Sequence, residues 1–340
     1  MMHIGRRGFM VGMGAFGLAT TLPTRRASAQ DKIILGDGAH KYEWQKDWLK
    51  LPDGVKLAST HGCVAVDSKD NIYFNTDNEN AIIVVEPSGK YIKSMAKDFR
   101  GGAHGMTIAK EGDKEVLYLS HTGRHEVVKM TLEGEVLLSI PFPEKAGIYK
   151  DGDKPSNKKY LPTSVAVAPN GDIYVGDGYG MSWVHQWNSK GEYIRSWNGQ
   201  DGEAGKFSTP HGVAIDLRGA EPRVIVADRG NHRIQVFTLE GKFISAHKDG
   251  LQSPCKVYLR GSDILIPDLA GWIAILDKDN KLVSRLGVAS KNGGNFGAPV
   301  DQWKDGEFTA PHGAAWDSKG NAYVEDWNKT GRVTKLVRVQ

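Results

Sequence analysis

Histidine recurs at one point of a repeating unit in this 340-residue chain, and each copy precedes a glycine and a short apolar segment. Neutral imidazole is a common ligand of divalent transition metals. Three imidazoles that leave a coordination position open are a donor set of catalytic zinc. The spacing therefore predicts a metal site, provided that the fold brings these side chains together. The four histidines are His61, His104, His211 and His312.

The repeating unit that must position them is clearest over residues 211–242. Its apolar residues alternate with polar ones, and Gly, Asn and Asp pairs interrupt the alternation, which is typical of short strands joined by hairpins. Units begin at 61, 104, 163, 211, 255 and 312, so successive starts lie 43 to 59 residues apart. Four-stranded units of this length are the blades of a β-propeller. The sequence predicts an all-β, six-bladed propeller.

The last unit reaches the end of the chain after only three strands. We expect residues 41–48, which precede the first unit, to supply the fourth strand. This N-terminal segment would close the last blade and remove an exposed sheet edge.

The innermost strand of each blade lines the axis of a propeller, so its first residue lies at one mouth of the central channel. Three of the four histidines, His104, His211 and His312, belong to alternate blades, which gives near three-fold geometry. Imidazole nitrogen favours zinc over calcium. His61 is a possible fourth ligand, a proton shuttle or a substrate contact. The six occupants of this ring position are His61, His104, Thr163, His211, Cys255 and His312.

The alternative is that these histidines only line the channel. The remaining histidines are assigned by their neighbours in sequence: His121 is expected either to support the site or to face solvent. His125 and His232 follow turns and are expected to bond local polar groups. His40, His185 and His247 are expected at the surface.

Residues 1–29 resemble a twin-arginine export signal, with Arg6-Arg7, a modest apolar run and small residues before cleavage near Ala29. A Sec signal or a retained anchor is the alternative. The apolar run is short for a bilayer, so we expect a mature propeller of residues 30–340, without a membrane span, in the periplasm or secreted.

The formal charge of +4 belongs to this leader, because its four arginines account for all of it. The rest of the chain is neutral, which gives no electrostatic basis for binding nucleic acid. The two cysteines, Cys63 and Cys255, are expected to be buried free thiols rather than a disulfide.

Two resemblances follow from these motifs. Residues 231–237 are close to the motif of NHL repeats, and residues 162–237 resemble the peptidylglycine α-hydroxyglycine amidating lyase family, a six-bladed zinc propeller. The resemblance implies that His104, His211 and His312 hold zinc. It also implies that Tyr179, in an Asp-Gly-Tyr turn, is the catalytic base and that Arg229 binds the substrate.

The chain also departs from that family. The family's first-blade arginine is replaced within residues 75–78, and its cysteine after the catalytic tyrosine is replaced by Gly180. The acidic calcium ligand that follows the third zinc histidine is replaced by Gly313, which leaves Ca²⁺ without that side chain. These departures predict a different substrate.

The leading hypothesis is therefore an exported, monomeric, zinc-dependent lyase that acts on a small-molecule or peptide-like substrate. A metal-dependent hydrolase, such as a lactonase, is a second hypothesis. The third is a non-catalytic propeller that binds an exported protein or a glycan.

Overall fold

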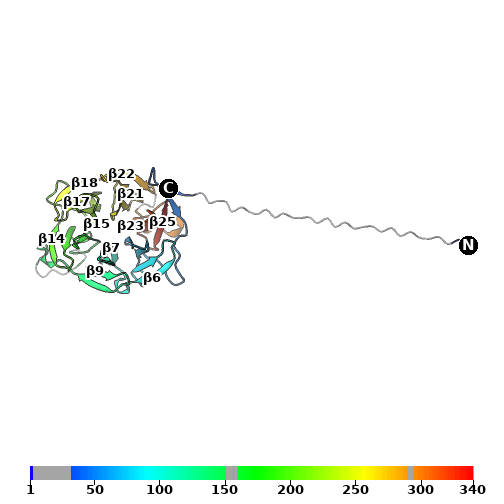
Figure 1. Ribbon diagram of the computed structural model, residues 1–340, viewed down its shortest axis with the longest axis horizontal. Helices are drawn as coiled ribbons and strands as arrows, with labels where there is room; N and C mark the ends of the chain where they lie inside the picture. The colour runs from blue at the N-terminus through cyan, green and yellow to red at the C-terminus, as the bar shows by residue number, and fades with distance from the viewer. Residues whose placement is uncertain (3–31, 151–155, 157–158, 289–293, 340) are drawn as a thin grey trace. The chain divides into compact units, whose positions relative to one another are not determined.

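Six antiparallel sheets surround a common axis in the computed structural model of the chain, which confirms the predicted six-bladed propeller (Figure 1). The structure describes residues 1–2, 32–150, 156, 159–288 and 294–339. Apart from residues 1–2, the export signal expected in residues 1–29 lies outside the described residues. The propeller occupies one unit of the chain, Lys32–Gln340.

The strands nearest the axis contain the ring positions of the second, fourth and sixth blades and begin one to three residues after those of the other three blades. Each pairs with the next strand of its own blade. The inner strands are β3 (Val64–Val66), β7 (Ala103–Glu111), β11 (Ser164–Val167), β15 (Pro210–Asp216), β19 (Tyr258–Arg260) and β23 (Pro311–Trp316). The second strands are β4 (Ile72–Asn75), β8 (Lys114–His121), β12 (Ile173–Asp177), β16 (Arg223–Asp228), β20 (Asp263–Asp268) and β24 (Ala322–Asp326).

The two outer positions of each blade complete the sheets. The third strands are β5 (Ile82–Val85), β9 (Glu126–Thr131), β13 (Trp183–Trp187), β17 (Arg233–Thr238), β21 (Trp272–Leu276) and β25 (Arg332–Arg338). The outer strands are β6 (Tyr91–Met95), β10 (Val136–Ile140), β14 (Tyr193–Trp197), β18 (Phe243–His247) and β22 (Leu282–Leu286). The described helices are single 3-10 turns, η1 (Lys97–Phe99), η2 (Glu144–Ala146), η3 (Arg229–Asn231) and η4 (Val300–Gln302).

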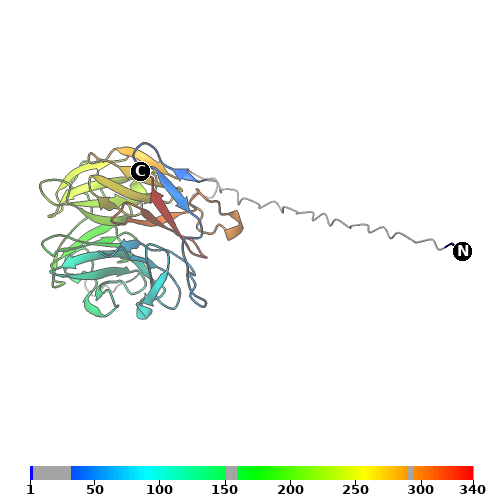
Figure 2. The same cartoon turned by 45° about the vertical axis from the view of Figure 1, so that its right-hand side comes forward.

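The sixth blade has no outer strand from its own repeat. Strand β2 (Tyr42–Gln45) pairs with β25 instead, with Trp44 opposite Leu336, and the short strand β1 (Ile34–Leu35) pairs with β2. Figure 2 shows the blue N-terminal strand beside the red C-terminal one. The two ends of the propeller therefore share one sheet.

The core lies between blades, where apolar side chains of neighbouring sheets pack against one another. Between the third and fourth blades, Tyr174, Val213, Val226 and Phe237 form one such buried cluster. Burial of each Val or Phe side chain stabilises the fold by roughly 1.5–3 kcal/mol. Both faces of a sheet are covered in this way, so the central strands are rich in Val, Ile and Leu.

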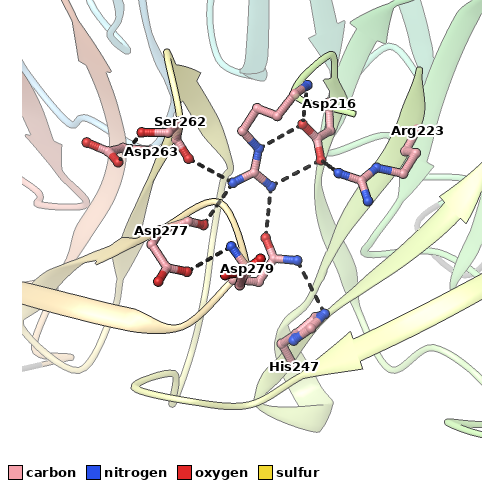
Figure 3. Close-up of polar contacts among 9 residues, drawn as sticks. Asp216, Arg223, His247, Ser262, Asp263, Asp277 and Asp279 are labelled. Carbon is pink, nitrogen blue, oxygen red and sulfur yellow. Dashed lines mark hydrogen bonds and ion pairs between the residues drawn. The ribbon is translucent and has the colours of Figure 1, made fainter. Parts of the chain in front are cut away.

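A polar clamp joins the fourth and fifth blades at the turn after β15 (Figure 3). The Arg218 guanidinium donates to both carboxylate oxygens of Asp216, at 2.8 and 3.0 Å. It also donates to the Asp277 carbonyl at 2.9 Å and the Ser262 carbonyl at 3.1 Å, both in the fifth blade. Arg223 donates to Asp216 at 2.6 Å. Burial alone would raise the pKa of Asp216, but the hydrogen bonds and charges of the two arginines hold it below its usual value.

Among the described residues, no helix has the length and apolar character that crossing a bilayer requires.

Candidate metal centre

Three of the ring histidines sit at irregularities in their strands. The pairing of β7, β15 and β23 with the next strand shifts register at His104, His211 and His312 respectively. A bulge of this kind re-aims a side chain relative to the regular alternation of the strand. All three side chains are buried, with at most 2 % of their surface exposed.

Each of these histidines is anchored to the next blade through Nδ1. The Nδ1 atoms of His104, His211 and His312 lie 2.7 Å from backbone carbonyl oxygens, of Thr163, Cys255 and Gly62 respectively. A carbonyl only accepts, so Nδ1 carries the proton and donates it. The lone pair is therefore on Nε2, so this is the tautomer in which Nε2 can bind a metal.

The glycine after each histidine makes this anchor possible. A Cβ at Gly212 would lie 2.6 Å from the Cys255 carbonyl oxygen, which is the same atom that accepts the His211 hydrogen bond. A Cβ at Gly105 would lie 2.4 Å from the Thr163 oxygen that accepts from His104. The His-Gly pair thus combines a donor with the space that its acceptor needs.

The Nε2 atoms of His104 and His312 are buried and lack a hydrogen-bond partner in the described part of the chain. Burial lowers the pKa of both imidazoles well below the usual value, and the neighbouring ring histidines and Arg229 lower it further. Neutral, unpartnered imidazole acceptors suit a metal cation.

Two overlapping groups of donor atoms could hold such a cation. One group is His61, His104 and His312, and the other is His211, Cys255 and His312; within each group the donor atoms lie within 4.8 Å of one another. The ring centroids of His104, His211 and His312 are 4.7 to 5.0 Å apart. Imidazole and thiol donors of this kind suit a transition-metal cation, and neither group contains His104, His211 and His312 together.

The structure brings Tyr179 and Arg229 to the same ring. The Tyr179 hydroxyl lies 3.0 Å from His211 Nε2 and 3.3 Å from His61 Nε2. Because His211 Nδ1 is the donor on that ring, its Nε2 accepts the tyrosine hydrogen. Burial raises the pKa of Tyr179 although the Arg229 charge lowers it. The Arg229 guanidinium lies 5.2 Å from the centre of the tyrosine ring.

Buried aspartates hold the turns that carry these two residues. Asp177 ends β12 and accepts from the backbone amides of Leu161, Gly180 and Met181, at 2.7 to 3.0 Å, which fixes the turn around Tyr179. A Cβ at Gly180 would lie 2.3 Å from the Asp177 carboxylate, so this turn requires glycine there. In the fourth blade Asp228 immediately precedes Arg229 and bonds the amide of Ser208 at 2.7 Å.

In the second blade, His121 fixes a turn as these aspartates do. It is buried, its Nε2 lies 2.9 Å from the Phe99 carbonyl and its Nδ1 accepts from the Arg124 amide at 3.0 Å. His121 ends the second strand of its blade, where aspartates lie in later blades. Its hydrogen-bond partners, Phe99 and Arg124, belong to loops of the second blade.

An aromatic stack that the sequence analysis missed leads away from the ring. The Trp327 ring lies 4.4 Å from that of His61 and nearly parallel to it, and Phe296 stacks on Trp327 at 4.3 Å. The Lys329 ammonium lies 5.5 Å from the Phe296 ring centre. The stack forms one wall beside His61.

The remaining histidine predictions have mixed outcomes. His125 and His232 bond the backbone carbonyls of Tyr160 and Gln252, as expected for residues that satisfy local polar groups. The surface prediction for His185 is wrong: its side chain is fully buried, and Nδ1 lies 2.6 Å from Ser196 Oγ. Cys63 and Cys255 are both buried and free, as expected.

The fold is a six-bladed β-propeller. The NHL repeat family matches residues 207–237 of the chain. Peptidyl-alpha-hydroxyglycine alpha-amidating lyase 1 of Drosophila melanogaster is 32% identical over 293 residues, which is 74% of this chain and 50% of that protein. Peptidyl-glycine alpha-amidating monooxygenase A of Xenopus laevis is 31% identical over 179 residues, 50% of this chain and 18% of that protein. The chain thus spans half or less of these two relatives.

Solved structures support the fold. A streptogramin B lyase structure superposes with a TM-score of 0.57 at 15% identity, over 87% of this chain and 97% of that one. A gluconolactonase from Xanthomonas campestris gives a TM-score of 0.59 at 12% identity, over 91% and 95%. These similarities show a shared propeller architecture.

Proposed function

We propose that this protein is a metal-dependent lyase, with zinc held by His104, His211 and His312 and with His61 as a possible fourth ligand. One observation carries the proposal: three buried histidines from alternate blades each fix Nδ1 on the next blade, which leaves Nε2 as the acceptor. The lyase name of the Drosophila melanogaster relative favours this reaction type.

The proposed substrate contains a carbinolamine, in which one carbon bears both a hydroxyl group and an amide nitrogen. Tyr179 would accept the hydroxyl proton as general base. The C–O bond then becomes a carbonyl as the C–N bond breaks, and the leaving nitrogen takes a proton. Bound zinc would supply Lewis acidity to the site. The products are an amide and a carbonyl compound.

Arg229 would anchor an anionic group of the substrate, since its guanidinium lies beside the ring of Tyr179. In the first blade, where the related lyases have an arginine, this chain has residues 75–78, and the wall beside His61 is formed by Trp327 and Phe296. A substrate with an apolar or aromatic portion would suit this wall.

The experiment that tests the proposal is elemental analysis of the protein purified without chelator. We expect near-stoichiometric zinc, and we expect His211→Ala to lose both the metal and the lyase activity on an N-acyl α-hydroxyglycine whose acyl group is aromatic. A His232→Ala variant, at an exposed histidine, is the matched control. A metal-free wild-type protein that regains no zinc on incubation would contradict the proposal.

Export is a separate part of the proposal. The Arg6-Arg7 pair and the small residues ending at Ala29 favour the twin-arginine route to the periplasm. N-terminal sequencing of the exported protein should begin near Gln30, and Arg6→Lys combined with Arg7→Lys should block export. Unchanged export of that double variant would leave this route without support.

A further inference from the structure

A cysteine occupies the ring position of the fifth blade. Cys255 is buried and free, and its sulfur lies with the donor atoms of His211 and His312 in a group whose members are all within 4.8 Å. His312 also belongs to the second donor group, with His61 and His104. The sulfur is therefore part of the same set of donors as the ring histidines.

The present partners of this thiol are weak. Its S–H donates to the Ser253 carbonyl at 3.6 Å, and its sulfur accepts from Arg229 Nη1 at 3.8 Å. Sulfur is a poor hydrogen-bond donor and acceptor, so neither contact satisfies it as an oxygen would be satisfied.

A second observation points to a cation beside the cysteine. His312 Nε2 is buried and has no hydrogen-bond partner among the described residues, although its Nδ1 is held by Gly62. An unpartnered buried acceptor is costly in a folded protein. A cation shared by the sulfur and the imidazole nitrogens would remove that cost.

We propose that Cys255 is a thiolate ligand of the metal centre, together with His211 and His312, so that the ring selects a thiophilic divalent cation. This inference rests on the proposed function, because it requires that the ring binds a metal. When the metal–sulfur bond forms, the thiol proton leaves to solvent and sulfur supplies both electrons. Neither the metal nor the sulfur changes oxidation state.

The donor set decides which cations fit. Thiolate and imidazole are typical ligands of zinc and related transition metals, whereas Ca²⁺ and Mg²⁺ prefer oxygen. Carboxylate oxygens are missing from both donor groups of the described residues. Burial raises the pKa of the Cys255 thiol to about 12, and the Arg229 guanidinium that contacts the sulfur offsets this only in part. Metal binding would therefore have to displace the thiol proton.

Cobalt(II) provides a direct test, because a thiolate bound to Co²⁺ gives an intense near-ultraviolet charge-transfer band that imidazole ligands do not give. The full chain would be stripped with chelator, loaded with Co²⁺ and examined by absorption spectroscopy, with bound cobalt measured by elemental analysis. Cys255→Ser and Cys255→Ala are the test variants. Cys63→Ser is the matched control, since Cys63 is also buried and free but belongs to neither donor group.

We expect the band in the wild-type protein and in Cys63→Ser, and its loss in both Cys255 variants. A wild-type protein that binds one Co²⁺ without this band would overturn the role of Cys255 and leave the metal-dependent lyase intact. A band that survives in Cys255→Ala would do the same. Failure of the folded wild-type protein to bind Co²⁺ or Zn²⁺ would overturn both proposals. Circular dichroism verifies that each variant is folded.

Discussion

The residue that follows each ring histidine is as constrained as the histidine itself. Gly212 faces the Cys255 carbonyl so closely that an added Cβ would lie 2.6 Å from its oxygen. Gly212→Ala should push this carbonyl away from His211 and weaken metal binding by roughly 10- to 100-fold, because the hydrogen bond that orients a ligand is lost. Equilibrium dialysis with zinc measures the affinity of each variant for the metal.

Gly219→Ala is the control for that substitution, since the nearest atom to its added Cβ would be at an ordinary 3.5 Å. Equal zinc affinities in the two variants would show that the glycine does not support the anchor.

Tyr179 is expected to affect turnover more than metal content. Its hydroxyl contacts His211 and His61, but its ring is held by a turn that Asp177 fixes independently. In the proposed lyase, Tyr179→Phe should therefore keep the bound metal and lose about 10²- to 10⁴-fold in kcat, which is the range of general acid–base catalysis. Steady-state kinetics and elemental analysis of the same sample measure both. A variant with the wild-type kcat would remove Tyr179 from the chemistry.

His185 should make the stability of the propeller depend on pH. Burial lowers its pKa from 6.5 to about 3, so the folded state excludes a proton that the unfolded state binds below pH 6.5. The stability is therefore fully present above pH 6.5 and declines as the pH falls towards 3, by at most about 1.4 kcal/mol per pH unit. His185→Asn should reduce this slope in urea titrations at pH 6, 5 and 4.

His232→Asn, at an exposed histidine, is the control for the pH titrations. An identical slope in the wild-type protein and His185→Asn would contradict the assignment.

The sequence was informative about ring residues because their position in the repeat determines where they lie. It was wrong about His185, because period-two alternation marks exposure only when one face of a sheet is solvated, and here both faces pack on neighbouring blades. Trp327 and Phe296 were missed because their stack forms between a loop and the end of a strand, where no periodicity applies.

At the scale of single elements, the turn after β15 stabilises the contact between the fourth and fifth blades as well as its own blade. Arg218 is nearly buried and joins Asp216 to two carbonyls of the fifth blade. Arg218→Ala should lower the free energy of unfolding by roughly 1.5–3 kcal/mol at pH 7, because Asp216 would lose its hydrogen bonds from Arg218 but keep the one from Arg223. The pKa of Asp216 is lowered in the fold, so this contribution is present above about pH 4 and is lost as the pH falls through the folded-state pKa.

Urea unfolding at pH 7 and pH 3 measures both effects. Arg195→Ala is the control, because that exposed arginine makes one hydrogen bond to the Glu240 carbonyl. A loss of stability no larger than that of Arg195→Ala would show that the clamp does not stabilise the fold.

Element boundaries show why the fold could be predicted better than the site. The six repeats were recognisable from their hairpins. The strand irregularities at the ring histidines depend on how closely the next blade approaches, which is a tertiary property. Similarly, the equivalence of His121 to the aspartates is visible only when its bonds to Phe99 and Arg124 are known.

For the molecule as a whole, the junction between β2 and β25 is expected to determine global stability. Trp44 is buried there, 5.2 Å from the ring of Phe308 and 4.9 Å from the Arg332 guanidinium. Trp44→Ala should destabilise the propeller by about 3–5 kcal/mol. Thermal unfolding followed by circular dichroism measures the change.

Trp183→Ala, at a half-buried tryptophan of the third blade, is the control. If both variants melt at the same temperature, the closing strand contributes no more to the stability of the propeller than a strand inside another blade.

The pairing of β2 with β25 has a consequence for biosynthesis. Residues 42–45 leave the ribosome long before residues 332–338. At about 5–20 residues per second, the early strand waits for roughly 15 to 60 seconds before its partner exists. Throughout that interval the edge of β2 that pairs with β25 has no partner. Chaperones that shield exposed edges should be most important for this protein before its last blade is made.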